Sequence, residues 1–205
     1  MIITLCGTKN SGKDTIADYF VSKYGFKKIS FAETLKDMLS IMFRWDRQML
    51  EGCDPEKRQI REQPDNWWSG RLGKTIVPRV MMQQFGTKVI REIHPDIFVY
   101  NLEQKINNII QENKNQNIII TDCRFFNEYK MLKKNKSIFI KVNRKTNNLE
   151  DTHISEQENK LFDTHYTINN NKDIQELYNE VDNIYSMVSL LLIGAVPSKC
   201  PSSFL

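Results

Sequence analysis

A lysine that follows two glycines near the start of the chain has the spacing needed to hold a chain of phosphates. The segment Gly7-Thr8-Lys9-Asn10-Ser11-Gly12-Lys13-Asp14-Thr15 lies between an apolar run and a helical pattern. Gly7 and Gly12 let the backbone curl so that successive N–H groups point at one anion, and Lys13 adds a full positive charge. The expected polyphosphate contacts are Gly7, Lys9, Asn10, Ser11, Gly12, Lys13, Asp14 and Thr15. An ordinary strand-to-helix turn, whose glycines serve only geometry, is the alternative.

A carboxylate, Asp14, occupies the position after the lysine, where phosphate-binding loops usually carry Ser or Thr to ligate magnesium. A carboxylate beside a polyphosphate is repelled unless a cation lies between them. Asp14 therefore predicts a bound Mg²⁺, held directly or through water. The alternative is a first-turn acidic residue that interacts favourably with the helix dipole, and both roles can hold together.

A second carboxylate, Asp122, ends the apolar run that begins at Ile118. We expect it to orient the magnesium shell or to accept a proton; a cap on the next helix is the alternative. The next residue is Cys123 and not the glutamate that activates water in many motor ATPases, which argues against ATP hydrolysis as the main reaction. Arg124 is expected to point toward the phosphates, held in place by Asn127-Glu128.

Further cations outside the glycine loop could bind a second phosphate. In the segment Pro78–Arg91, Arg79 and Arg91 could clamp a phosphate with forked hydrogen bonds, while Gln83 or Gln84 could read a base edge. The alternative for each is a solvated helix face.

Three more basic residues are candidates for phosphate contacts. Lys36 follows the second predicted strand and could bind a phosphate. Arg144 and Lys145 follow the fourth predicted strand, where a cation arriving with a lid would neutralise charge on a migrating phosphoryl group. A surface charge cluster is the alternative for this pair.

The elements that must position these residues alternate between strand and helix. The predicted strands are Met1–Cys6, Lys27–Phe31, Asn117–Asp122, Ser137–Val142 and roughly Thr164–Ile168. The predicted helices are Lys13–Tyr24, Ala32–Phe43, Pro78–Ile93, Pro95–Asn113, Phe125–Lys134 and Lys172–Leu192. This order predicts an α/β fold with a parallel sheet between two helical layers. Ligands of such sheets bind beyond the carboxyl ends of the strands, where the glycine loop and Asp122 both fall.

Composition fits a single α/β domain of 205 residues. The net charge of +4 is mild and the basic residues are scattered, so we expect no nucleic-acid partner. The four cysteines are far apart, which favours free thiols in a reducing cytoplasm. No basic segment precedes an apolar stretch, and the late apolar run Met187–Val196 is too short to span a bilayer. We therefore expect neither a secretory signal nor a membrane partner.

One domain is expected over residues 1–192, with a loose tail at 193–205. The interval between Arg44 and Val77 is polar, punctuated by Pro and Gly, and contains Trp67-Trp68. With its neighbouring helices it is interpreted as a substrate-side insertion of about 33–113. The irregular stretch of about 143–156 is interpreted as a mobile lid.

These segments together resemble the deoxynucleoside monophosphate kinases of bacteriophages and large DNA viruses, within the wider nucleoside monophosphate kinase group of P-loop proteins. The matching blocks cover the chain in family order to about Val181. They are GKDT at 12–15, ISFAETLK at 29–36, PR at 78–79, QQFGT at 83–87 with Arg91, PDIFV at 95–99, TDCRFFNE at 121–128, HISE at 153–156 and YTINN at 166–170.

The resemblance implies a P-loop NTPase fold of three α/β/α layers around a five-stranded parallel sheet. It also implies ATP on the glycine loop, Mg²⁺, a deoxynucleoside monophosphate (dNMP) as substrate, a homodimer, and a cytoplasmic location, in the host if the chain is viral. Together with the roles assigned above, the expected catalytic residues are Lys13, Asp122, Arg124 and Arg144, with Asp14 and Asp122 at the metal. The acceptor residues are Lys36, Arg79, Gln83, Thr87 and Arg91.

Phosphoryl transfer from ATP to a dNMP is therefore the leading hypothesis. A related small-molecule kinase, such as a phosphomevalonate or dephospho-coenzyme A kinase, is the first alternative, although the QFGT and D-x-R-F-x-N-E blocks fit it less well. A non-catalytic nucleotide-binding module is the second, although Lys13 and the arginines are all present.

Overall fold

A computed structural model describes residues 1–52, 54–145 and 161–192. Its sheet has five parallel strands within these residues, in the order β2-β3-β1-β4-β5. The strands are β1 (Ile2–Cys6), β2 (Lys27–Ile29), β3 (Ile118–Ile120), β4 (Ile138–Asn143) and β5 (Tyr166–Asn169). The parallel α/β sheet expected from the sequence is thus confirmed, with each strand within a few residues of its predicted place.

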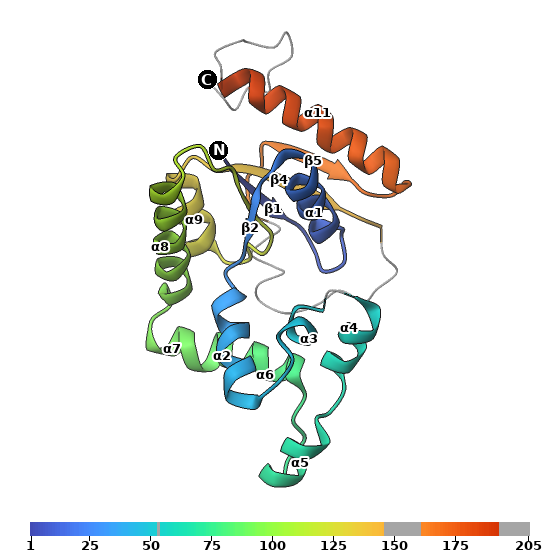
Figure 1. Cartoon of the computed structure of the whole chain (residues 1–205), viewed down its shortest axis with the longest axis vertical. Coiled ribbons are helices and arrows are strands. Elements are labelled where there is room, and N and C mark those ends of the chain that lie inside the picture. Colours follow the sequence, from blue (N-terminus) through green and yellow to red (C-terminus); the bar gives the residue numbers. More distant parts are fainter. Residues whose placement is uncertain (53, 146–160, 193–205) are drawn as a thin grey trace. The chain divides into compact units, whose positions relative to one another are not determined.

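One face of the sheet is covered by α1 (Lys13–Tyr24) and α11 (Ile174–Leu192), which follow the first and last strands (Figure 1). Phe20 of α1 and Val181 of α11 are fully buried together with Ile140 of β4. Apolar side chains at helical spacing on both helices form this layer because each helix buries one stripe. The helix α1 ends at Gly25, whose left-handed φ of 67° provides the turn into β2.

The opposite face of the sheet is covered by α9 (Phe126–Lys134). Side chains alternate along a strand, so Phe139 points away from its neighbour Ile140. Its ring lies 4.7 Å from that of Tyr129 on α9, measured between centroids. The helix α8 (Ile97–Glu112) precedes β3 in the chain. Helices on both faces make the three layers that the sequence predicted.

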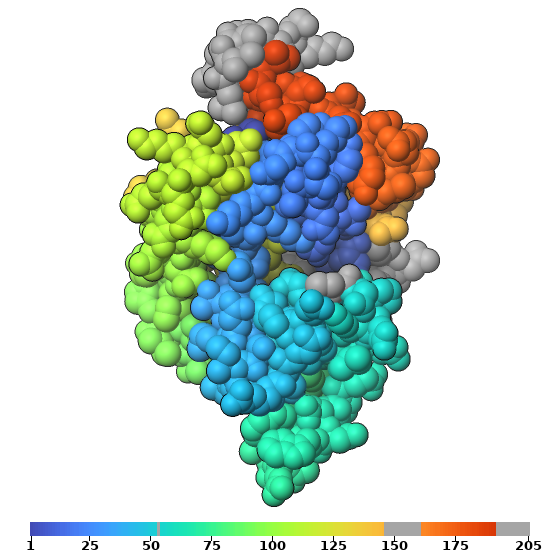
Figure 2. Space-filling model, in the orientation of Figure 1, coloured from blue at the N-terminus to red at the C-terminus, as the bar shows by residue number. Residues whose placement is uncertain are grey.

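The chain separates into two compact units. Unit 1 comprises Met1–Ser30 and Lys105–Leu205 and contains the sheet, whereas unit 2 comprises Phe31–Gln104. Within unit 2, α2 (Glu33–Phe43) is followed by α3 (Arg47–Glu51), α4 (Pro55–Glu62) and α5 (Asn66–Leu72). The side chains of α2, α3 and α4 lie side by side on one surface of this unit in Figure 2, coloured blue to cyan.

The interval 44–77 is more ordered than its polar composition suggested. Aspartates open its short helices: the Asp46, Asp54 and Asp65 carboxylates accept backbone N–H groups of Gln48, Lys57 and Trp68. Trp68, the second residue of the tryptophan pair, has a packing role that the sequence did not reveal. Trp68 Nε1 donates to the Phe43 carbonyl at 2.8 Å, and Trp45 stacks on the Phe43 ring.

The helix expected over 78–93 is not a continuous α-helix. It consists of α6 (Pro78–Gln84), a π-helical segment η1 (Phe85–Ile90) and α7 (Arg91–Ile93). Gly86 sits in the π-helix against α2: a Cβ there would lie 3.2 Å from Leu35 Cδ2. Sequence periodicity cannot separate these helix types here, because buried positions four residues apart fit one face of either helix. π-helical turns are rare and occur often at functional sites.

Two expected features fall outside the described residues: most of the lid of about 143–156, and the tail at 193–205. Among the helices that the structure describes, none is both long and apolar enough to cross a bilayer.

Candidate active site

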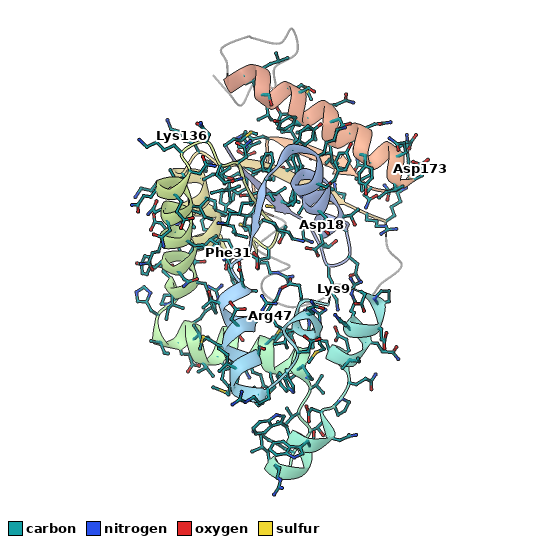
Figure 3. The ribbon with its side chains drawn as sticks, in the orientation of Figure 1. Lys9, Asp18, Phe31, Arg47, Lys136 and Asp173 are labelled. Atoms are coloured by element: carbon teal, nitrogen blue, oxygen red, sulfur yellow. The ribbon has the colours of Figure 1, made fainter. Side chains whose placement is uncertain are left out.

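The loop after β1 has the geometry of a phosphate-binding loop. Lys13 folds back over it, and its ammonium donates to the carbonyls of Gly7 at 2.9 Å and Thr8 at 2.6 Å. Gly12 is the residue before α1, so the N-terminal N–H groups of that helix follow directly. Figure 3 labels Lys9 on this loop and Asp18 on the helix after it. The structure thus brings the predicted residues 7–15 together at the end of the central strand.

Both glycines are required by close backbone approaches as well as by their φ angles. Gly7 has a φ of 142°, and a Cβ there would lie 2.2 Å from the Val142 carbonyl oxygen of β4. Gly12 has a φ of 104°, and a Cβ there would lie 2.3 Å from Nδ2 of Asn170. Few side chains tolerate such φ values, and neither position has room for one. The tight curl that the sequence predicted is therefore supported by contacts with β4 and with the loop after β5.

Asp14 has a cationic partner that the sequence analysis missed. Lys28 Nζ of β2 lies 3.2 Å from the Asp14 carboxylate and 3.0 Å from that of Asp18. Burial alone would lower the pKa of the Lys28 ammonium, but the two aspartates outweigh it and raise that pKa. Lys28 compensates the charge of Asp14, so the need for a cation does not by itself imply magnesium at this residue.

Asp122 lies where the second carboxylate was expected. Thr4 of β1 pairs with Ile120 of β3, so two residues further on Asp122 is level with Cys6, immediately before the glycine loop. Cys6 and Cys123 are free and buried, and burial, with a hydrogen bond to Cys6, raises the pKa of the Cys123 thiol. In the described part of the chain, no three His, Cys, Asp or Glu side chains form a metal cage.

The two carboxylates expected at the metal, Asp14 and Asp122, fit the ligand preference of magnesium. Mg²⁺ is usually held by one or two carboxylates together with substrate phosphates and water, and Asp14 and Asp122 could supply the carboxylates.

The loop after Asp122 is fixed by a buried carboxylate. Glu128 is 1% exposed, and its Oε2 accepts the backbone N–H of Arg124 at 2.8 Å and that of Phe125 at 3.1 Å. Asn127 Oδ1 accepts the N–H of Glu128 at 3.0 Å. The sequence anticipated that Asn127-Glu128 would hold Arg124, and the Glu128 carboxylate holds its backbone N–H. Arg124 itself is half-buried.

Arg144 follows the last residue of β4 and is exposed. Its neighbour Lys145 donates its backbone N–H to Asn171 Oδ1 at 2.7 Å. The backbone next to Arg144 is therefore hydrogen-bonded to the loop after β5.

In unit 2, the predicted acceptor residues follow one another every four positions along α6, η1 and α7. Arg79, Gln83, Thr87 and Arg91 are all half-buried, whereas Val80, Gln84 and Lys88 beside them are exposed. Residues four apart share a helix face. The half-buried members therefore form one face that presents two guanidinium groups, one amide and one hydroxyl.

Two of these residues are held by local contacts. Thr87 Oγ1 donates to the Gln83 carbonyl at 2.6 Å. Arg91 Nη1 donates to the Pro95 carbonyl at 3.1 Å, and its guanidinium lies 5.0 Å from the centroid of the Phe98 ring. The Phe98 ring thus restricts the Arg91 side chain, which leaves fewer rotamers to fix when a phosphate binds.

Lys36, the remaining acceptor residue, is paired with a carboxylate inside unit 2. Its ammonium lies 2.6 Å from Glu51 Oε1, and Arg47, labelled in Figure 3, donates to Glu51 Oε2 at 2.7 Å and to Asp37 at 2.5 Å. Burial alone would raise the pKa of the Glu51 carboxyl, but Lys36 and then Arg47 lower it to about 2. The sequence missed Glu51, because nothing in its spacing marks it as the partner of Lys36.

A glycine loop closed by its own lysine, opening a helix after the central strand of a parallel sheet, defines a P-loop protein. The structures similar to this chain agree with that class. Dephospho-CoA kinase from Campylobacter jejuni has a TM-score of 0.50 and 15% identity, covering 92% of this chain and 96% of that one. The crystal structure of TT1252 from Thermus thermophilus has a TM-score of 0.50 and 13% identity, covering 91% and 96%. At such identities the likeness shows the fold alone.

Sequence comparison identifies the family within this class. The model of the family described as deoxynucleotide monophosphate kinase matches residues 1–64 and 65–181, so the chain belongs to that family. A protein of Acanthamoeba polyphaga mimivirus, named provisionally as a deoxynucleotide monophosphate kinase, is 30% identical over 190 residues, covering 88% of this chain and 94% of the relative. The chain is therefore a nucleotide kinase, an enzyme that transfers a phosphoryl group to a small molecule.

Proposed function

We propose that this kinase transfers the γ-phosphoryl group of ATP to a dNMP, giving a dNDP and ADP. The observation that carries the proposal is the half-buried face of Arg79, Gln83, Thr87 and Arg91, a cationic and polar surface in a different unit from the glycine loop. An ATP-hydrolysing protein needs no second phosphate site. Membership of the family and the name of the viral relative support the same substrate class.

The donor is held by the loop after β1. P-loop kinases in general use ATP with magnesium. Lys13, whose ammonium is bound by two loop carbonyls, exchanges these for oxygens of the ATP phosphates, so a positive charge is already oriented before the donor arrives. Asp14 and Asp122 would hold magnesium, which when bound neutralises phosphate charge and polarises the γ-phosphoryl group.

The acceptor is held by the cations of unit 2. Arg91 and Arg79 bind its phosphate through forked hydrogen bonds, with Lys36 as a third cation and Gln83 and Thr87 as polar contacts to the nucleoside. A phosphate oxygen is already ionised at neutral pH, so the reaction needs no general base. The bond from this oxygen to the γ-phosphorus forms as the bond to the β,γ-bridging oxygen breaks, and ADP leaves with the electron pair.

Positive charge near the migrating group stabilises the transition state, because its three equatorial oxygens carry the negative charge. Arg124 is proposed for this role on the basis of its position after Asp122, and Arg144 on the basis of its position after β4. Both stand at the carboxyl ends of strands of unit 1.

The organisation expected from the sequence complements this proposal: a single kinase domain over 1–192, with an acceptor-binding insertion of about 33–113 and a lid of about 143–156 that excludes water. The homodimer and the cytoplasmic location stay predictions.

The decisive experiment measures ADP formation from ATP and Mg²⁺ with each common dNMP and NMP in turn. We expect turnover with at least one dNMP. Dephospho-coenzyme A and phosphomevalonate are added as acceptors, and activity with either of them alone would overturn the substrate assignment. If ATP binds but ADP formation stays flat with every acceptor, the chain is a binding module.

Two variants separate the donor from the acceptor. Lys13→Ala should lower kcat by about 10²–10⁴-fold, because a preorganised charge on the transferring group is lost.

Arg91→Ala should mainly raise the KM for the dNMP, by about tenfold or more, with little change in the KM for ATP. Unfolding curves that match wild type establish that both variants fold. Wild-type kinetics for Arg91→Ala would disprove the acceptor assignment.

A further inference from the structure

The loop after β5 contacts the phosphate-binding loop through one side chain. Asn170 Nδ2 donates to the Ser11 carbonyl at 2.9 Å, across 159 positions of sequence. Ser11 is buried, with 1% of its surface exposed, so its carbonyl needs this partner. The same nitrogen occupies the space that a Cβ on Gly12 would fill. The Asn170 amide therefore needs a glycine at position 12, because any side chain there would displace it.

The position of Asn170 is itself fixed by the sheet. Its backbone N–H donates to the Asn143 carbonyl, the last residue of β4, at 2.8 Å. The next residue, Asn171, accepts the backbone N–H of Lys145 at 2.7 Å and donates its own N–H to the Asn169 carbonyl at 2.8 Å. The backbone from which the Asn170 side chain extends is thus held by contacts with the end of β4 and with its own loop.

The contact matters for phosphate binding because of what the loop must do. Lys13 and the N–H groups of residues 8–13 have to keep one arrangement while two glycines and Asn10, all with positive φ, leave the backbone free to adopt others. Asn10 has a φ of 63°, outside the region that most residues prefer. A donor fixed by the sheet that binds the Ser11 carbonyl restricts this freedom before any ligand is present.

We propose that Asn170 is a positioning residue of the ATP-binding loop, which holds Ser11 and Gly12 in the conformation that binds the donor phosphates. The inference rests on the proposed function in one respect, that ATP is the donor; it does not depend on which molecule is the acceptor. Because Asn170 contacts the loop that binds the donor, its loss should weaken donor binding specifically. It should leave the acceptor unaffected.

The test compares Asn170→Ala and Asn170→Leu with wild type. Leucine has the same number and branching of side-chain heavy atoms as asparagine, although it is bulkier, and it has no N–H to donate; alanine removes the side chain beyond Cβ. A loss of affinity shared by both variants therefore points to the hydrogen bond and not to the change in packing. Asn179→Ala is the matched control, because Asn179 is an exposed asparagine on α11 outside the loop. The Kd for Mg·ADP is measured by calorimetry without any acceptor, and the KM values for ATP and for the best dNMP are measured separately.

We expect both Asn170 variants to raise the Kd for Mg·ADP and the KM for ATP by about tenfold, the loss expected when a hydrogen bond that orders a buried group is removed. The KM for the dNMP should stay within about twofold, and the melting temperature without ligand within a few degrees. Asn179→Ala should match wild type throughout.

Three results would overturn the inference: a Kd for Mg·ADP within twofold of wild type in both variants, equal increases in the two KM values, or a fall in Mg·ADP affinity that simply follows a lower melting temperature. The last two would indicate a general structural role. A wild-type protein that binds Mg·ADP but phosphorylates no dNMP would refute the proposed acceptor alone, and the Mg·ADP comparison would still decide the role of Asn170.

Discussion

Lys36 has a carboxylate partner, Glu51, that the sequence did not predict. The sequence treats Lys36 as a free cation for a phosphate, whereas the structure shows it bound to Glu51 at 2.6 Å. Arg47 holds the other oxygen of the same carboxylate. A phosphate that binds Lys36 must therefore share the ammonium with Glu51, whose carboxylate keeps the lysine in a single direction.

The Glu51 pair predicts a specific pH dependence of stability. The pKa of Glu51 is lowered to about 2 in the folded protein, below its ordinary value of 4.5. A lowered carboxyl pKa stabilises the fold above the unfolded pKa, and this contribution is lost as the pH falls from about 4.5 toward 2. We expect Glu51→Gln to be less stable than wild type at pH 7 and the difference to shrink steadily below pH 4.5.

The measurement is urea unfolding of both proteins at several values between pH 7 and pH 3. Glu112→Gln, a change at an exposed residue at the end of α8, is the control and should follow wild type. A difference between Glu51→Gln and wild type that is independent of pH would show that the carboxylate does not act through its charge.

At the scale of elements, the helix that begins at the phosphate-binding loop is attached to α11 by one carboxylate. Asp182 of α11 accepts hydrogen bonds from Tyr24 at 2.6 Å, Tyr19 at 3.1 Å and Lys23 at 2.7 Å, all on α1. Tyr19 also stacks on Tyr178, with ring centroids 4.0 Å apart. The position of α1 on the sheet thus depends on polar contacts as well as on the apolar core.

Removing this carboxylate should destabilise unit 1. We expect Asp182→Ala to lower the free energy of unfolding by about 1–2 kcal/mol, because two tyrosine hydroxyls lose an acceptor. The melting temperature should fall by a few degrees for a chain of this size. Lys23→Met is the comparison: Lys23 is an exposed ion-pair partner, so its loss should change little. A melting temperature for Asp182→Ala equal to that of wild type would contradict the proposed attachment.

At the scale of the whole molecule, the two compact units allow donor and acceptor binding to be told apart. A ligand slows hydrogen exchange where it stabilises the native structure it contacts. A non-hydrolysable ATP analogue with Mg²⁺ should slow exchange in peptides from residues 1–30 and from the ends of β3 and β4. A dNMP alone should slow it in peptides from 31–104, above all across α6 and η1.

Hydrogen exchange followed by mass spectrometry checks this assignment, with a nucleoside that lacks the phosphate as control. The nucleoside should give weaker protection of Arg79 and Arg91, since it has no anion to bind. Protection by the dNMP confined to residues 1–30 would place the acceptor on the glycine loop and refute the division of roles.

The sequence was most informative where structure is determined by neighbours in the chain. The helix expected at Lys13–Tyr24 is α1 with the same bounds, because Gly12 and Gly25 adopt positive φ at its two ends. Interruptions of longer patterns were harder to predict. The π-helix inside 78–93 was missed, since its buried positions recur every four residues, a spacing that fits one face of an α-helix and of a π-helix alike.

Residue types and spacing alone determined the phosphate-binding loop, the alternation of strand and helix, and the cations available for a second phosphate, because φ preferences, periodicity and charge are local properties. Only the tertiary structure decided which side chains support them. Lys28 meets Asp14, Glu51 meets Lys36 and Asn170 meets Ser11 across intervals whose pairing depends on strand order and helix packing. Such contacts form between strands, loops and helices that only folding brings together, so they cannot be predicted from spacing along the chain.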